Sequence, residues 1–121
     1  MTILKRTPLY EAHVAAGAKM VPFAGFEMPV SYAGGIEEHN AVRERAGLFD
    51  VSHMGEFIVS GPDTWTYMDH VVTNDCSKLP ADGVLYTAMC HENGGVVDDL
   101  LVMKLADDRA LVVVNASNID K

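Results

Sequence analysis

The sequence predicts an α+β fold in which helices pack on one face of an antiparallel sheet. Three extended segments near the C-terminus carry this prediction, at residues 84–90, 96–105 and 110–115. The first two are separated by HENGG, whose Asn93-Gly94 pair is typical of a tight hairpin turn. The last two are joined by the short segment ADDR. Because such short turns connect antiparallel neighbours, the three segments are expected to form a meander.

Three helices are expected before the meander. Thr7-Pro8 is a start signal for a short helix that ends at Gly17. A second helix is expected from Ile36 to the residues before Gly47, and its thin apolar stripe predicts a surface position. A third is expected in residues 62–72, where Pro62 occupies a favoured first position.

The remaining segments are expected to be extended. Residues 48–61 are expected to form a turn that leads into a strand, in which Phe57 and Val59 alternate with Glu56, Ile58 and Ser60. Residues 19–35 contain Pro22 and Pro29, so only broken extended pieces and loop are expected there.

Composition and charge exclude several classes of partner. The chain has 121 residues, enough for one domain with one core, and 49% of them are hydrophobic. Nine basic and 17 acidic residues give a net charge of −8, whereas a nucleic-acid interface needs a basic patch. We therefore expect no nucleic-acid partner. The sequence shows neither a signal peptide nor an apolar run of membrane-spanning length, so we expect no membrane contact and a cytoplasmic location.

Cysteine and histidine placement predicts no metal site. Cys76 and Cys90 lack metal-ligand spacing and are interpreted as reduced structural thiols, while the five histidines are scattered singly. Asp50, Ser52 and His53 together suggest a nucleophilic triad. However, Ser52 and His53 point to different sides of an extended segment, so we do not expect a hydrolase.

The segment GGVVDDLLVMKL places two adjacent carboxylates, Asp98 and Asp99, at the head of an apolar strand. Side chains alternate along a strand, so Asp99 shares a face with Val97, Leu101, Met103 and Leu105, and Asp98 with Leu100, Val102 and Lys104. We therefore expect Asp99 to face the more apolar side and Asp98 to lie in solvent or in the turn. A charged group on an apolar face must be neutralised or find hydrogen-bond donors, and either outcome suits a functional acid. The alternative is that Asp99 accepts backbone hydrogen bonds near the turn, or lies in water at a frayed strand end.

Asn115 ends the last strand on the same face as Leu111 and Val113. A buried amide there can read the hydrogen-bonding edge of a ligand. The alternative is that it ties down the turn that follows the strand.

Four segments together resemble a known family. In order and spacing, RTPLYEAHVAAGAKMVPFAGFEMPV, EHNAVRERAGLFDVSHMGEF, CHENGGVVDDLLV and VVVNASNIDK are similar to the N-terminal third of the glycine cleavage system T proteins, which are tetrahydrofolate-dependent aminomethyltransferases. The similarity covers essentially the whole chain. GLFDVSHM and GGVVDDL are specific strings within it. The resemblance implies that residues 1–121 are the N-terminal part of a folate-binding domain and that the remaining parts lie outside this chain.

The resemblance also implies a reaction and a site. A one-carbon unit would pass as an aminomethyl group from the lipoyl arm of the glycine cleavage H protein to tetrahydrofolate, with release of ammonia. Asp99, which strand alternation also selects, would be the catalytic carboxylate. The folate-binding positions implied are Met54, Tyr86, Asp99, Val113 and Asn115. The piece alone would form only part of a cavity, so we expect it to be inactive by itself.

Two alternatives share the same domain. One is another folate-dependent demethylase with a different donor, and the other is a folate-binding homologue without transfer activity. An acid at position 99 disfavours the second.

Overall fold

The structure is a computed structural model that describes residues 3–121. The chain divides into two compact units, an N-terminal unit that ends at His53 and a C-terminal unit that spans Met54–Lys121. Between residues 3 and 121, no helix is long and apolar enough to cross a membrane.

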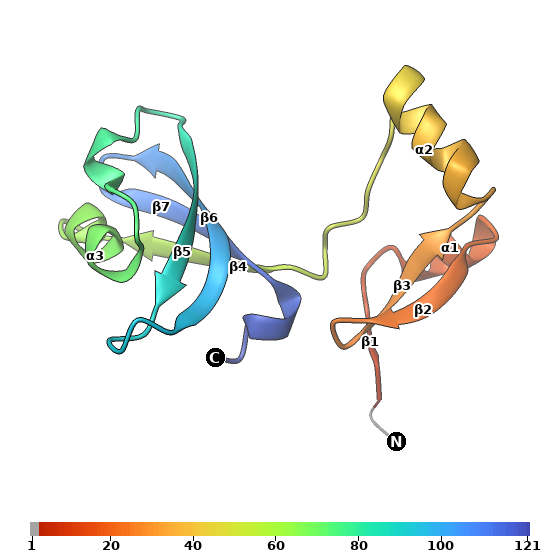
Figure 1. The fold of residues 1–121 in the computed structure, drawn as a ribbon, viewed down its shortest axis with the longest axis horizontal. Coiled ribbons are helices and arrows are strands. Elements are labelled where there is room, and N and C mark those ends of the chain that lie inside the picture. Colours follow the sequence, from red (N-terminus) through yellow and green to blue (C-terminus); the bar gives the residue numbers. More distant parts are fainter. Residues whose placement is uncertain (1–2) are drawn as a thin grey trace. The chain divides into compact units, whose positions relative to one another are not determined.

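The C-terminal unit is built on a four-stranded antiparallel sheet (Figure 1). Its strands are β4 (Gly55–Ser60), β5 (Val84–Cys90), β6 (Val96–Ala106) and β7 (Arg109–Val114), in the order β4-β7-β6-β5. The β5–β6 hairpin turns at Gly94, whose φ of +83° is the left-handed conformation that an Asn-Gly turn requires. The predicted antiparallel meander of β5, β6 and β7 is confirmed.

One face of this sheet is covered by helix α3 (Thr64–Val71) and the short 3₁₀ turn η1 (Cys76–Lys78). Apolar side chains of both elements meet the side chains of β6 and β7 there. The resulting core contains Met68, Val72, Cys76, Leu100, Val102, Ala110, Val112 and Val114. The predicted α+β architecture, with helices on one face of an antiparallel sheet, is confirmed.

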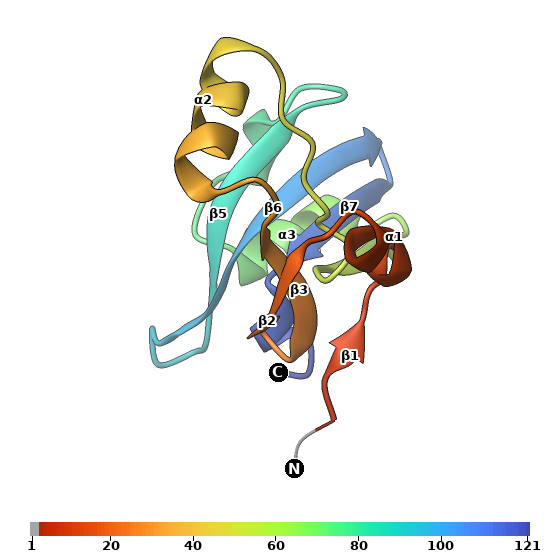
Figure 2. The same cartoon turned by 90° about the vertical axis from the view of Figure 1, so that its right-hand side faces the viewer.

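The N-terminal unit contains a smaller sheet in the order β1-β3-β2 (Figure 2). Its elements are β1 (Lys5–Arg6), α1 (Tyr10–Ala15), β2 (Lys19–Phe23), β3 (Phe26–Ser31) and α2 (Gly35–Glu44). Helix α1 lies beside β3, and α2 buries no side chain, as its thin apolar stripe predicts.

The β2–β3 hairpin is more regular than the sequence predicts. Pro22 lies on the edge strand β2, where a missing N–H is tolerated. Pro29 lies in β3 beyond the two residues that pair with β1, so β3 has a neighbour on only one side at this position. The prolines thus occupy positions where they remove few hydrogen bonds between strands. The expected extended pieces are present, but their pairing into a hairpin was not predicted.

A buried carboxylate connects helix α1 to two loop segments of the N-terminal unit. Asp50, whose side chain is 1% exposed, accepts hydrogen bonds from Thr7 Oγ1 at 2.8 Å, His13 Nε2 at 2.8 Å and the Ser52 main-chain N–H at 2.9 Å. His13 Nδ1 in turn lies 2.7 Å from the Tyr32 hydroxyl. Burial by itself would raise the pKa of Asp50, but the hydrogen bonds outweigh it and hold the pKa far below its ordinary value.

His53 takes no part in this network. Its ring packs edge-on against Phe23 and Phe26, with centroids 5.6 and 6.3 Å away. Asp50 therefore pairs with His13, which lies 37 residues away in the sequence, rather than with the neighbouring His53.

Candidate functional site

The predicted site residues lie in the C-terminal unit, on or next to the sheet face opposite α3, which we name the second face. Tyr86 on β5 pairs with Leu101 on β6, and Leu101 pairs with Val113 on β7. Directly paired residues point to the same side of an antiparallel sheet, so these three share the second face with Asp99. Tyr86 is 67% exposed, while Leu101 and Val113 are half-buried.

Three of the predicted residues form one hydrogen-bond network. The Tyr86 hydroxyl donates to Asp99 Oδ2 at 2.5 Å. Asn115 Nδ2 lies 3.1 Å from Asp99 Oδ1 and 2.9 Å from the Asp99 main-chain oxygen. Both oxygens of the Asp99 carboxylate are thus held, one by a donor on β5 and the other by a donor directly after β7. The hydrogen bond to Asp99 and the nearby negative charge raise the pKa of Tyr86.

The predicted burial of the two aspartates is wrong. Asp99 is exposed, whereas Asp98 is buried at 4% exposure together with Leu100 and Val102. The assignment of residues to two faces holds, but α3 packs on the face of Asp98 rather than on that of Asp99. The number of apolar residues on each face of β6 does not determine which face a helix elsewhere in the chain covers. Asp99 therefore remains a candidate catalytic residue because of the family resemblance and its hydrogen bonds, and not because of desolvation.

Asp98, which was expected in solvent or in the turn, has a structural role that the sequence analysis did not predict. Its Oδ2 accepts from the Asn115 main-chain N–H at 2.8 Å, and its Oδ1 accepts from Asn115 Nδ2 at 3.0 Å and from Asn118 Nδ2. Burial favours a raised pKa, but these donors outweigh it and lower the pKa of Asp98. The available sequence signal was the pair of asparagines three positions apart directly after a strand.

Asn115 is compatible with both of its predicted roles. Its contacts with Asp98 tie β6 to the 3₁₀ turn η2 (Ala116–Asn118), as the turn interpretation predicts. Its contacts with Asp99 place it in the candidate site. Within residues 3–121, no hydrogen bond reaches its side-chain oxygen Oδ1, so this acceptor is available to a ligand.

Met54 and Val113 supply apolar surface near the network. Val113 lies on the second face next to Leu101. Met54 is half-buried and directly precedes β4, one position beyond the pair that Gly55 forms with Val114. The register therefore places Met54 level with Asn115. Contact of either residue with a ligand remains a prediction.

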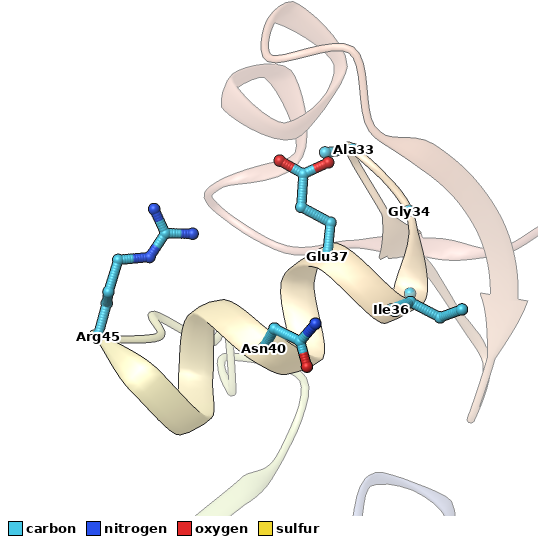
Figure 3. A pocket seen from close by; sticks show the side chains of 7 residues that line it. Ala33, Gly34, Ile36, Glu37, Asn40 and Arg45 are labelled. Carbon is cyan, nitrogen blue, oxygen red and sulfur yellow. The ribbon is translucent and has the colours of Figure 1, made fainter.

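The N-terminal unit has a shallow hollow along α2 (Figure 3). It is lined in part by Gly34, Ile36, Glu37, Asn40 and Arg45. It contains none of the predicted site residues. In the described residues, no group of three or more His, Cys, Asp or Glu side chains is arranged to hold a metal ion.

Comparison with known proteins identifies the family. The sequence profile described as the GCVT N-terminal domain matches residues 9–121. The chain belongs to this family. It is 57% identical over 118 residues to an aminomethyltransferase of Thermotoga maritima and 59% identical over 121 residues to one of Desulforamulus reducens. These matches cover 98% and 100% of this chain but 32% and 33% of the relatives, so the chain spans about a third of the length of the curated relatives it matches.

A solved structure gives the same result. The glycine cleavage system aminomethyltransferase T from Bartonella henselae matches with a TM-score of 0.87 and 38% identity, over 98% of this chain and 33% of that one. The predicted resemblance is confirmed, and the chain is a homologue of the N-terminal portion of aminomethyltransferases.

Proposed function

We propose that this chain provides part of the tetrahydrofolate site of an aminomethyltransferase of the glycine cleavage system. The reaction would transfer the aminomethyl carbon from the lipoyl arm of the H protein to tetrahydrofolate and release ammonia, in the cytoplasm. Family membership and the identity to named aminomethyltransferases support this proposal. The observation that carries the site is the Asp99 carboxylate on the second face, whose two oxygens accept hydrogen bonds from Tyr86 on β5 and from Asn115 directly after β7.

The residues of the second face fit a flat heterocyclic amine. Leu101 and Val113 offer half-buried apolar surface, and the exposed Asp99 lies next to it. The free Asn115 Oδ1 adds an acceptor for an N–H group. Apolar walls with a few polar groups in fixed positions are typical of small-molecule sites. Tetrahydrofolate, when bound, would supply the amine nitrogens that accept the one-carbon unit.

Asp99 would act through position and charge. A carboxylate beside the accepting amine can take its N–H hydrogen bond and stabilise positive charge that develops during transfer. The hydrogen bonds from Tyr86 and Asn115 fix the plane of the carboxylate before the ligand arrives. Such preorganisation avoids a reorientation cost during the reaction.

The test replaces Asp99 by asparagine in the complete gene product. We expect Asp99→Asn to lower turnover by about a hundredfold or more, since one preorganised electrostatic group contributes on this scale. Tetrahydrofolate binding should change little, because the amide has the same shape. Methylene transfer from the aminomethylated, lipoylated H protein measures the first quantity, and titration calorimetry with tetrahydrofolate measures the second.

Asp107→Asn is the matched control, because Asp107 is fully exposed at the β6–β7 turn. It removes the same charge and should leave turnover unchanged. Unchanged turnover in Asp99→Asn would refute the catalytic assignment. Absence of tetrahydrofolate binding by the unmodified protein would refute the proposed function.

A further inference from the structure

Asp98 is a buried carboxylate directly next to the proposed catalytic Asp99. Its side chain lies on the side of β6 that packs against α3, where Leu100 and Val102 are almost fully buried. A charge at such a position is destabilising unless hydrogen bonds compensate for the lost water. The donors that compensate here come from the turn after β7, 17 and 20 residues away in the sequence.

The Asp98 carboxylate holds Asn115 at two points. Oδ2 accepts from the Asn115 main-chain N–H at 2.8 Å, and Oδ1 accepts from the Asn115 side-chain Nδ2 at 3.0 Å. Asn118 Nδ2 donates to the same Oδ1. The backbone and the side chain of Asn115 are thus both fixed by one carboxylate.

These contacts determine which end of the Asn115 carboxamide faces the aspartates. Nδ2 meets three acceptors, which are Asp98 Oδ1, the Asp99 main-chain oxygen and Asp99 Oδ1. A reversed carboxamide would place its own oxygen against these three oxygens, without a hydrogen atom between them. Only the NH₂ end is therefore stable in this position, and Oδ1 must point away from the aspartates.

We propose that Asp98 is a positioning residue that sets the orientation of the Asn115 carboxamide. In this orientation Nδ2 clamps Asp99, and Oδ1 is presented to a bound ligand as a hydrogen-bond acceptor. A reduced pterin carries several N–H donors, so an acceptor here selects for the donor edge of tetrahydrofolate. This inference rests on the proposed function for its ligand, but the orientation itself is a property of the chain alone.

A double-mutant cycle in the complete gene product tests the inference. Asp98→Asn keeps the shape but turns one of the two acceptors into a donor, so Asn115 can reverse and release Asp99. We expect this variant to raise the KM for tetrahydrofolate and to lower kcat, each by about tenfold, the scale of a lost charge-assisted hydrogen bond. Asn115→Ala should produce similar changes.

The two substitutions together should be no worse than Asn115→Ala alone. If Asp98 acts through Asn115, its replacement has no further effect once the Asn115 carboxamide is absent. If Asp98 only supports the fold, the effects of the two substitutions multiply. Multiplying effects on kcat and KM would overturn the inference.

Asn118→Ala is the matched structural control. It removes one hydrogen bond from the same Asp98 Oδ1 but leaves both bonds between Asp98 and Asn115. We expect kcat and KM within about twofold of the unmodified protein, because a single neutral donor to Asp98 is lost without freeing Asn115. A loss equal to that of Asp98→Asn would show that disruption of the turn, rather than reversal of the amide, lowers activity.

If Asp98→Asn does not fold, hydrogen exchange of the Asn115 side-chain amide in the unmodified protein still tests the inference. The Asn115 Nδ2 protons should exchange with solvent at least about tenfold more slowly than those of Asn93, an exposed asparagine in the β5–β6 turn. Equal exchange rates in the side-chain amide NMR signals would overturn the inference. This readout needs no ligand, so it still decides the orientation where tetrahydrofolate binding fails.

Discussion

The two units of the chain are organised around different kinds of interior. In residues 3–53 the residues that are buried as a whole are Thr7, His13 and Met28, two of them polar. The Asp50 side chain, which is 1% exposed, connects the segments that carry the first two. In the C-terminal unit eight apolar residues form a continuous core between α3 and the sheet. The N-terminal unit thus depends on directional hydrogen bonds, and the C-terminal unit depends on apolar burial. Each unit also contains one buried carboxylate. Asp50 accepts the hydrogen bonds that connect segments of its unit, whereas Asp98 lies next to a core that other residues form.

The largest loss of stability is expected from a substitution in the apolar core. Leu100 is 2% exposed, and Leu100→Ala should lower the free energy of unfolding of the C-terminal unit by about 3 kcal/mol, since it removes packing and leaves a cavity. Hydrogen exchange followed by mass spectrometry should show faster exchange in residues 54–121 and little change in residues 3–53. Equal acceleration in both segments would contradict the division into separately stabilised units.

Regular periodicity explains which parts of the fold the sequence could predict. The alternation in β6 separated Asp98, Leu100 and Val102 correctly from Asp99 and Leu101, because side chains in a strand alternate between two faces. The face that α3 covers could not be read from β6, because it depends on packing by residues such as Met68 far along the chain.

The site was predictable to a similar extent. Tyr86 came from the family resemblance alone, whereas the strand pattern also pointed to Asp99 and Asn115. The structure joins the three in one network. Asp98 was wrongly assigned to solvent or the turn because its partners follow another strand, and only the folded register brings them together.

A smaller effect, confined to the N-terminal unit, is expected from Asp50→Asn. The substitution weakens the hydrogen bonds from Thr7 and His13, and should lower the stability of this unit by about 2 kcal/mol. Because the pKa of Asp50 is lower in the folded than in the unfolded state, its stabilising contribution is present above an unfolded pKa of about 3.9. The contribution is lost as the pH falls below that value toward the folded pKa.

Exchange in residues 3–53, compared at pH 7 and pH 3, measures this dependence. In the unmodified protein the N-terminal unit should lose protection as the pH falls, after correction for the intrinsic exchange rate. In Asp50→Asn most of that loss should already be present at pH 7. An Asp50→Asn variant that retains the full pH dependence would show that other carboxylates control the acid response of this unit.

The smallest change in stability is expected when the partner of Asp75 is removed. Asp75 is an aspartate at the surface that accepts short hydrogen bonds. Lys78 Nζ lies 2.7 Å from Asp75 Oδ2, and the two side chains are 82% and 41% exposed. The hydrogen bond from Lys78 is the largest of the causes that lower the pKa of Asp75 to about 2. Lys78→Ala should therefore raise this pKa toward its ordinary value, which a carboxyl NMR titration measures. Stability at pH 7 should not change measurably, because water and salt screen an exposed pair and its side chains lose rotamer freedom on pairing. A loss of stability as large as that of Asp50→Asn would mean that bond geometry, rather than burial, decides how much a carboxylate contributes in this chain.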